Sequence, residues 1–482
     1  MTTRTRAMGV LFAVLFCFAP AFAQITVQGG VDDPSSAKQE DHPSSITVEF
    51  QMTQADIDGL LGSVDEVIAF DSKFTGLRTH GTVERKMTSR DEIKQLMTKR
   101  MQDPENAERV QRSTAVLQKF GFVPRGFDAG KFAVESMTSQ LGGYYDPKVK
   151  TLYLLNWLPA QSQRPVMAHE LDHALQDQNF DLINWWKTDD PAANAATGGD
   201  DSEQHAARRA VVEGQATAVM IEYMLSSQGR SLTQMPPLAP EVFQRVIDRY
   251  SNLQTTQSAP LIMRQEMTFP YVYGLAFVHQ LMLKAGKQEA FAGIFKRPPI
   301  STREIMEPAV YLAHEKLPAL PMPDVLEALG KDYEKVENGS LGEFDCSTLI
   351  KQYGQTPDEA RAIATNWRGD YFFAATHRRS DNKSGTEASK LKPEDISLLF
   401  TSRWATPTAA LAFAKFYRGT VPKRYGGAKA AEMGVETGSV ELWNTAEGPV
   451  SIRVAGNLVL VVEGFDQPAA ERLISAVLTK DK

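Results

Sequence analysis

Residues 166–178 read Val-Met-Ala-His-Glu-Leu-Asp-His-Ala-Leu-Gln-Asp-Gln, a helix-like segment that contains the pattern H-E-x-x-H at 169–173. Side chains four residues apart lie on one face of a helix, so the imidazoles of His169 and His173 can reach one metal ion. Two His, one further ligand and a water form a catalytic Zn²⁺ site, in which Glu170 is placed to act as the general base. The alternative without a metal site is an ordinary helix with two surface His. With only eight His in 482 residues, the pattern favours the zinc site.

A third ligand is expected from a second helix over residues 204–225. A closely spaced third His would stand six residues after His173, where the chain has Asn179. Glu213 lies on a mostly apolar face of the second helix, and the small neighbour Gly214 favours a tight helix contact. We therefore predict that Glu213 completes the metal site, at the short distance that a carboxylate ligand needs.

Two other interpretations of this region remain open. Glu213 could form an ion pair with Arg209, four residues earlier on the same helix, and His205 could be the third ligand instead. Thr217, one turn after Glu213, is a candidate hydrogen-bond partner for a ligand His.

This arrangement resembles the gluzincin group of zinc metallopeptidases, which have the thermolysin-like architecture. The resemblance covers residues 130–315, although the separation of His173 from Glu213 is longer than in thermolysin, and Thr217 stands where many gluzincins have Asp. It implies that His169, His173 and Glu213 hold Zn²⁺ and that the substrate is a peptide or protein. It also implies that the hairpin expected at 142–155 borders the cleft and pairs with extended substrate. An ordinary core hairpin is the alternative.

An oxyanion formed during peptide hydrolysis needs a donor besides the metal, and Tyr or His side chains can supply one. The candidates are Tyr271, Tyr273 and His279, which follow a proline break at Pro270 where a new helix is expected to open. We predict Tyr273 as the catalytic donor. A purely structural aromatic is the alternative at each of these positions.

The N-terminus has the features of a secretory signal peptide over residues 1–23. Two Arg precede an apolar run over 8–20, and Ala21-Phe-Ala23 forms a cleavage site before Gln24. An uncleaved anchor is the alternative, but the run is short for a membrane span. These features predict a bacterial periplasmic or secreted protein with no membrane span after cleavage, and residues 24–45 form a polar, flexible leader.

Cleavage removes Arg4, Arg6 and Cys17. The formal charge then falls from −7 to −9, which argues against nucleic acid or an anionic membrane as a partner. Cys346 remains alone, so no intramolecular disulfide forms, and a buried thiol is expected there. Oligomeric state is not indicated.

The predicted fold class is α+β, with two folded parts. Residues 46–335 are expected to form a mainly helical, zincin-like catalytic domain with a small sheet, including helices at 53–62, 89–102 and 106–120. Residues 336–482 are expected to form a smaller α+β accessory domain, with strand–helix units at 396–418 and 458–479.

The sequence thus predicts an exported zinc metallopeptidase. Two alternatives are a zinc-binding envelope protein with a structural or binding role, and a zinc hydrolase that acts on something other than peptides. The retained Glu170 argues against the first, because a structural site has no use for a base.

Overall fold

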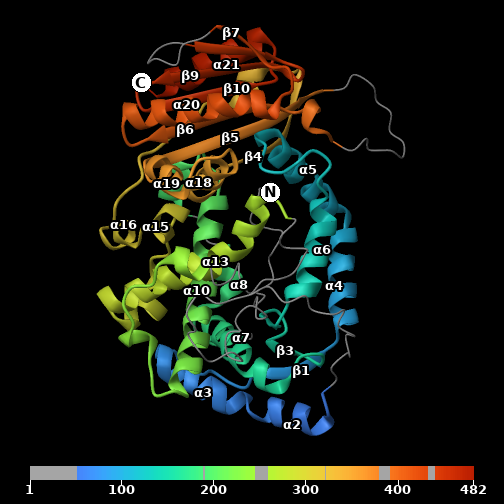
Figure 1. Ribbon diagram of the computed structural model, residues 1–482, viewed down its shortest axis with the longest axis vertical. Helices are drawn as coiled ribbons and strands as arrows, with labels where there is room; N and C mark the ends of the chain where they lie inside the picture. Colours follow the sequence, from blue (N-terminus) through green and yellow to red (C-terminus); the bar gives the residue numbers. More distant parts are fainter. Residues whose placement is uncertain are drawn as a thin grey trace, which may run out of the picture.

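The computed structural model describes residues 52–187, 190–244, 259–320, 322–378, 391–432 and 440–481. The expected signal peptide and leader lie outside these residues. The fold is α+β, as predicted, with a helical part and a seven-stranded sheet at opposite ends of the molecule (Figure 1). Within the described residues no helix is both long and apolar enough to cross a membrane.

The first helices are α2 (Gln54–Gly62), α3 (Val64–Thr75), α4 (Arg90–Gln102), α5 (Pro104–Phe120) and α6 (Ala129–Gln140). They include the three that were predicted, α2, α4 and α5, and two that were not, α3 and α6. The start of α4 is set by a capping box, in which Ser89 accepts from the N–H of Glu92 and the Glu92 carboxylate accepts from the N–H of Ser89.

A small sheet lies beside the helix that carries H-E-x-x-H. Its strands are β1 (Glu84–Thr88), β2 (Gly143–Asp146) and β3 (Thr151–Leu155), in the order β1-β3-β2. The pair β2–β3 is the expected antiparallel hairpin, and β1 runs parallel to β3. Strand β2 is therefore an edge strand, next to the helix.

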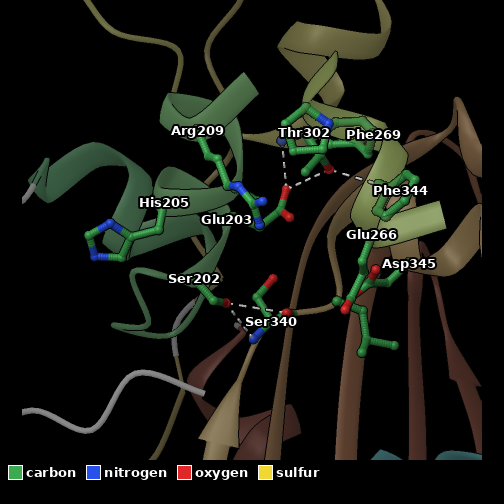
Figure 2. A pocket seen from close by; sticks show the side chains of 13 residues that line it. Ser202, Glu203, His205, Arg209, Glu266, Phe269, Thr302, Ser340, Phe344 and Asp345 are labelled. Carbon is green, nitrogen blue, oxygen red and sulfur yellow. Dashed lines mark hydrogen bonds between the residues drawn. The ribbon is translucent and has the colours of Figure 1, made fainter. Parts of the chain in front are cut away.

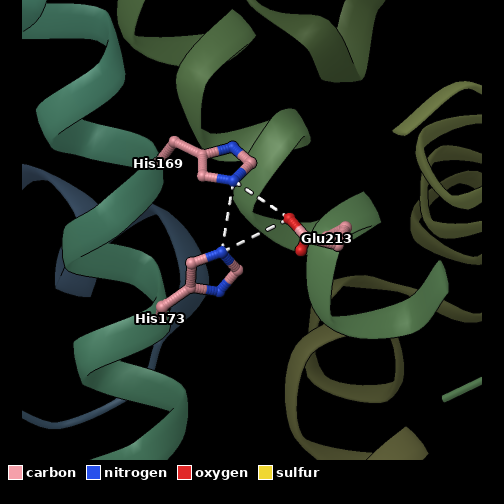
Figure 3. Close-up of side chains that lie close together, drawn as sticks. All are labelled: His169, His173 and Glu213. Carbon is pink, nitrogen blue, oxygen red and sulfur yellow. Dashed lines mark hydrogen bonds and ion pairs between the residues drawn. The ribbon is translucent and has the colours of Figure 1, made fainter. Parts of the chain in front are cut away.

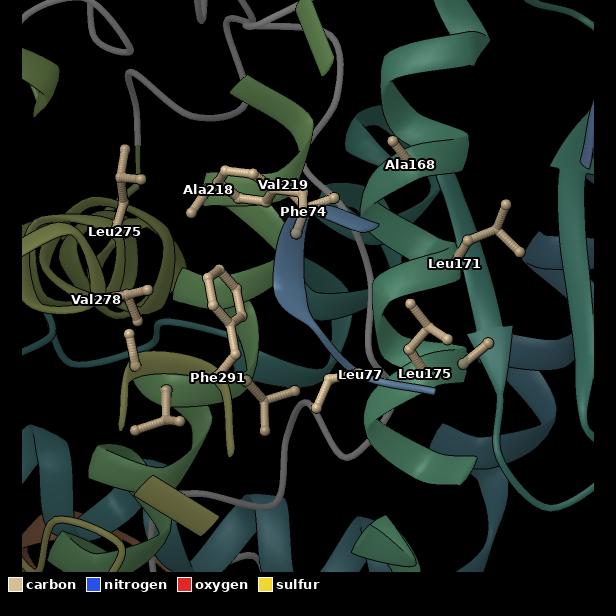
Figure 4. Close-up of a cluster of buried hydrophobic side chains, with 14 of the residues drawn as sticks. Phe74, Leu77, Ala168, Leu171, Leu175, Ala218, Val219, Leu275, Val278 and Phe291 are labelled. Atoms are coloured by element: carbon tan, nitrogen blue, oxygen red, sulfur yellow. The ribbon is translucent and has the colours of Figure 1, made fainter. Parts of the chain in front are cut away.

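Three long helices form the centre of the helical part: α7 (Ala160–Phe180), α10 (Ser202–Ser226) and α13 (Leu261–Ala285). The apolar core between them includes Leu171, Val219 and Leu275 (Figure 4). Phe74 and Phe291 belong to the same buried cluster. The expected helix start at Pro270 is wrong, because α13 begins nine residues earlier and continues through the proline. Burial of an apolar helix on most of its surface outweighs the backbone hydrogen bond that a proline removes.

Short elements connect the long helices and strands. They are α8 (Leu182–Trp185), α9 (Pro191–Ala196), η1 (Leu232–Gln234), η2 (Glu289–Gly293), α14 (Ile294–Lys296), α15 (Thr302–Met306), α16 (Pro308–Leu312), α17 (Val325–Leu329), α18 (Gly342–Gln352), α19 (Pro357–Ala364) and η3 (Pro393–Asp395). Two of them, α8 and α9, occupy the segment between α7 and α10 that lengthens the spacing from His173 to Glu213.

The second sheet has the antiparallel order β4-β5-β6-β10-β9-β8-β7. Its strands are β4 (Tyr333–Gly339), β5 (Trp367–His377), β6 (Ser397–Trp404), β7 (Lys429–Glu432), β8 (Val440–Thr445), β9 (Gly448–Ala455) and β10 (Leu458–Glu463). Both predicted strand–helix units are confirmed, since α20 (Pro407–Arg424) follows β6 and α21 (Gln467–Lys480) follows β10.

Alternate residues of these strands face opposite sides of the sheet. Phe372 and Phe400 contribute to a core with α20, whereas Phe373 and Leu399 contribute to a separate core with α21. Cys346 of α18 is a buried free thiol on the α20 side, as expected.

Helix α5 joins the two parts of the molecule, because its C-terminal end packs on the second sheet. The Phe120 ring lies edge-on to Phe372 at 5.4 Å and to Phe400 at 5.6 Å. Next to it, Lys119 is buried and its ammonium pairs with Glu447 at 3.1 Å. The second sheet thus shares its core with a helix that comes from well before residue 336.

Candidate metal centre

His169 and His173 lie one turn apart on α7 and direct their Nε2 atoms toward Glu213 of α10 (Figure 3). The two Nε2 atoms are 3.2 Å apart, and Oε2 of Glu213 lies 3.2 Å from His169 Nε2 and 3.5 Å from His173 Nε2. All three side chains are fully buried. Among the described residues, this is the group of His, Cys, Asp or Glu side chains whose ligand atoms converge as a metal site requires.

The spacing of these three atoms fits a tetrahedral zinc ion. Bonds of about 2.0–2.1 Å at tetrahedral angles separate two ligand atoms by roughly 3.3–3.4 Å. The measured separations of 3.2, 3.2 and 3.5 Å agree with that value. In addition, Oε1 of Glu213 is buried without a hydrogen-bond partner. A buried carboxylate oxygen with no donor is costly, and a cation at this point would remove that cost.

Without a metal, the triad holds a proton in place of the cation. Burial lowers the pKa of His169 to about 4. Burial also disfavours the charged form of His173, but its hydrogen bond to Glu213 and the charges of Glu213 and Glu170 outweigh this and raise its pKa to about 9. The hydrogen bonds from both His likewise outweigh burial at Glu213 and lower its pKa to about 2. A binding metal must therefore displace a proton from His173.

Gln176 orients His173. Its side-chain oxygen lies 2.9 Å from His173 Nδ1 and accepts the Nδ1 proton, so the proton that a metal would displace is the one on Nε2. The Gln176 amide nitrogen in turn donates to the carbonyl oxygen of Val212 at 3.0 Å and to Oε1 of Gln215 at 2.9 Å, both on α10. Gln176 therefore fixes a ligand and joins the two ligand helices.

The sequence interpretation missed Gln176 and chose Thr217 as the supporting residue. That choice is wrong, since the Thr217 hydroxyl donates to the carbonyl oxygen of Glu213, four residues earlier on α10. A Thr in a helix readily makes this local bond. The available signal was the position of Gln176, three residues after His173 on the same helix face.

Glu170 lies beside the ligands, facing β2. Its Oε2 accepts a 2.8 Å hydrogen bond from the main-chain N–H of Tyr145, and the side chain is fully buried. The strand comes close to the helix because Gly143 has no side chain: an added Cβ would lie 3.2 Å from Val166 and 3.6 Å from Cγ of Glu170. The edge strand thus holds the carboxylate next to His173, whose pKa it raises.

Helix α13 crosses α10 at two glycines. An added Cβ on Gly214 would overlap the backbone of Gly274, and one on Gly274 would overlap the carbonyl oxygen of Ala210. Gly214 therefore serves the contact of α10 with α13, whereas the sequence interpretation assigned it to the contact between the ligand helices. The crossing brings Tyr271 to the metal centre, where its ring lies 6.1 Å from that of His169.

The other two candidates have different neighbours. Tyr273 is partly buried, with its ring 5.3 Å from that of Phe269. His279 is buried and its Nε2 bonds to the carbonyl oxygen of Leu232 at 2.9 Å, which is a structural role.

The two alternatives for the third ligand are also placed by the structure. His205 Nε2 lies 3.1 Å from Asp201, outside the converging group. The ion pairs of Glu213 are with the two His and not with Arg209.

Comparison with known proteins gives a match only in the C-terminal part of the chain, which contains the second sheet. Residues 331–474 match the model of a family described as a domain of unknown function, DUF8575. This match spans β4 to the middle of α21 and contains none of the three residues of the metal centre. No curated protein and no solved structure matches the chain.

Proposed function

We propose that this protein is a zinc metallopeptidase with a zincin-like, gluzincin-type catalytic domain, exported through the signal peptide at residues 1–23. The observation that carries the proposal is the tetrahedral spacing of His169 Nε2, His173 Nε2 and Glu213 Oε2 in a buried site beside Glu170. A purely structural site would have no need of that additional buried carboxylate.

Zinc held by His169, His173 and Glu213 would polarise a carbonyl group and make a water acidic enough to react at neutral pH. Glu170 accepts a proton from the attacking water and later delivers it to the leaving amine. The N–H of Tyr145 holds one oxygen of this carboxylate, so that Glu170 does not have to be ordered during the reaction.

The donor to the oxyanion is better supplied by Tyr271 than by Tyr273. Tyr271 is buried beside His169, and the glycine contact of α10 with α13 fixes its helix. Tyr273 packs on Phe269, and the charges that act on its hydroxyl come from Glu241, Arg361 and Glu343. A phenol that donates a hydrogen bond to a developing oxyanion stabilises the transition state.

The edge position of β2 supports a peptide as the substrate. Edge strands bind extended peptides through backbone hydrogen bonds, and β2 is an edge strand beside the helix of the metal centre. The N–H of Tyr145 is already bonded to Glu170, so the peptide would have to use the other main-chain groups of this edge. The same residues would serve a zinc hydrolase acting on other acyl compounds, so the substrate class has to be measured.

A digest of a mixed peptide library tests the proposal. We expect cleavage by the purified protein, loss of cleavage with a zinc chelator and recovery when zinc is added back. Absence of peptide cleavage by zinc-loaded protein, together with hydrolysis of simple ester substrates, would support the non-peptide hydrolase instead. Zinc binding without either activity would support the binding role.

A further inference from the structure

A second polar site lies where α10, α13 and α18 meet (Figure 2). It is a cavity of about 80 Å³, which is room for roughly five water molecules. Its wall carries the carboxyl groups of Glu203, Glu266 and Asp345 and one guanidinium, that of Arg209. With all four groups ionised, three negative charges and one positive charge leave the wall at −2.

Two of these carboxyl groups lack hydrogen-bond donors. Within the described residues, Asp345 forms no hydrogen bond and no ion pair although the residue is only 7% exposed. Its neighbour Glu266, which is partly buried, likewise forms none (Figure 2). By contrast, Oε2 of Glu203 accepts from the N–H and the hydroxyl of Thr302, both at 2.9 Å. Glu266 and Asp345 are therefore the carboxyl groups of the wall that have no protein hydrogen-bond donor.

Glu266 and Asp345 retain a proton between them. Burial raises the pKa of Glu266 to about 7, against the charge of Arg209. Burial, and then the charge of Glu266, raises the pKa of Asp345 well above its ordinary value. A cation that enters between the two carboxyl groups would take the place of this proton and allow both groups to ionise.

The rest of the wall suits an organic cation. Phe269 and Phe344 both line the cavity and pack on each other with ring centroids 4.2 Å apart, so part of the wall beside the carboxyl groups is aromatic. A guanidinium group can contact aromatic rings and donate to two carboxylates at once. A bare metal ion is a poorer fit, because among the described residues only the His169 group has three converging ligand atoms.

The cavity is close to the metal centre along both helices. Arg209 is one turn before Glu213 on α10, and Phe269 and Pro270 directly precede Tyr271 on α13. A side chain bound in the cavity would therefore belong to a chain that passes near the metal ligands.

We propose that this cavity binds a basic side chain, guanidinium or ammonium, through Glu266 and Asp345. That the site selects basic residues in a peptide substrate rests on the proposed function, whereas binding of the cation does not.

The test uses the full chain after chelator treatment, so that it requires no catalysis. Titration calorimetry with Nα-acetyl-arginine amide should show binding with release of protons, detected as a heat that depends on the ionisation enthalpy of the buffer. Nα-acetyl-citrulline amide has nearly the same shape without the charge, and we expect it to bind at least tenfold more weakly. Equal binding of the two compounds, or no binding of either, would overturn the proposal even if the zinc-loaded protein cleaves peptides.

Variants identify the site. Glu266→Gln and Asp345→Asn should each weaken binding of the arginine amide at least tenfold. Glu337→Gln is the matched control, because Glu337 is also buried with a pKa raised to about 8 but bonds to Ser113, away from the cavity. Unchanged binding in both cavity variants, each with a normal thermal unfolding curve, would place the cation elsewhere and contradict the proposal. If either variant does not fold, the comparison of arginine with citrulline amide on the parent protein still decides.

Discussion

The main-chain N–H of Tyr145 donates a 2.8 Å hydrogen bond to Oε2 of Glu170, which ties the edge strand β2 to the helix that carries two metal ligands. Tyr145 is anchored separately, because its hydroxyl donates to Asp177 of the same helix at 2.9 Å. Strand and helix therefore hold each other at two points, on either side of His173. This arrangement keeps a buried carboxylate beside the metal site without making it a ligand.

Glu170→Gln should retain zinc and fold but lose activity. The amide oxygen of Gln can still accept from Tyr145, whereas it cannot take a proton from water. Removal of a well-placed general base costs about 10²–10⁴-fold in turnover, or roughly 3–5 kcal/mol of transition-state stabilisation. Turnover, zinc content and thermal unfolding should be measured on the same preparation. Equal turnover by parent and variant would show that the activity resides elsewhere.

Glu213→Ala should weaken zinc binding at least tenfold, because the site loses its one charged ligand and keeps two His. His205→Ala is the control, since its imidazole pairs with Asp201 and lies outside the converging group. Zinc affinity can be measured by competition with a chromogenic chelator. The reverse result, with zinc lost in His205→Ala and kept in Glu213→Ala, would mean that the third ligand is misassigned.

Gln176→Leu should lower zinc affinity about 10–100-fold although Gln176 is not a ligand. The variant removes the acceptor of His173 Nδ1 and the donor to Gln215, so the imidazole loses its orientation. Thr217→Val should leave zinc affinity unchanged, because the hydroxyl bonds only within its own helix in the structure. Similar losses in both variants would indicate a general effect on packing rather than an effect on His173.

Tyr271→Phe should reduce kcat by about 10²–10³-fold with little change in KM, as expected for loss of a donor to a transition-state oxyanion. Tyr273→Phe should have a much smaller effect, because its ring packs on Phe269. Steady-state kinetics on one peptide substrate compares the two variants. A large loss in Tyr273→Phe alone would support Tyr273, the residue that the sequence analysis favoured.

Gly274→Ala should destabilise the fold by about 1–3 kcal/mol, because an added Cβ overlaps the carbonyl oxygen of Ala210 and forces α13 away from α10. Gly59→Ala, in the exposed helix α2, meets no atom within 4 Å and should be neutral or slightly stabilising. Urea unfolding of both variants measures the difference. If Gly274→Ala were as stable as the parent, the close crossing that positions Tyr271 would not exist.

Local sequence patterns predicted the elements well where one residue type sets the local geometry. The capping box at Ser89 starts α4, and the run around His169 forms a helix with both imidazoles on one face. The strand–helix units at 396–418 and 458–479 were predicted from their apolar residues. The proline at 270 misled the prediction, because the packing that carries a helix through a proline comes from distant segments.

The sequence by itself determined the spacing of His169, Glu170 and His173, because helical periodicity depends only on residues four positions apart. Only the tertiary structure decided what stands opposite them. Glu213 is 40 residues after His173, on another helix. Whether Glu213 meets the two His, pairs with Arg209 or leaves the ligand position to His205 depends on which face of α10 packs on α7. The same is true of Gln176, Tyr271 and the Glu266–Asp345 pair, since each is defined by a contact between chain segments whose separation no local pattern encodes.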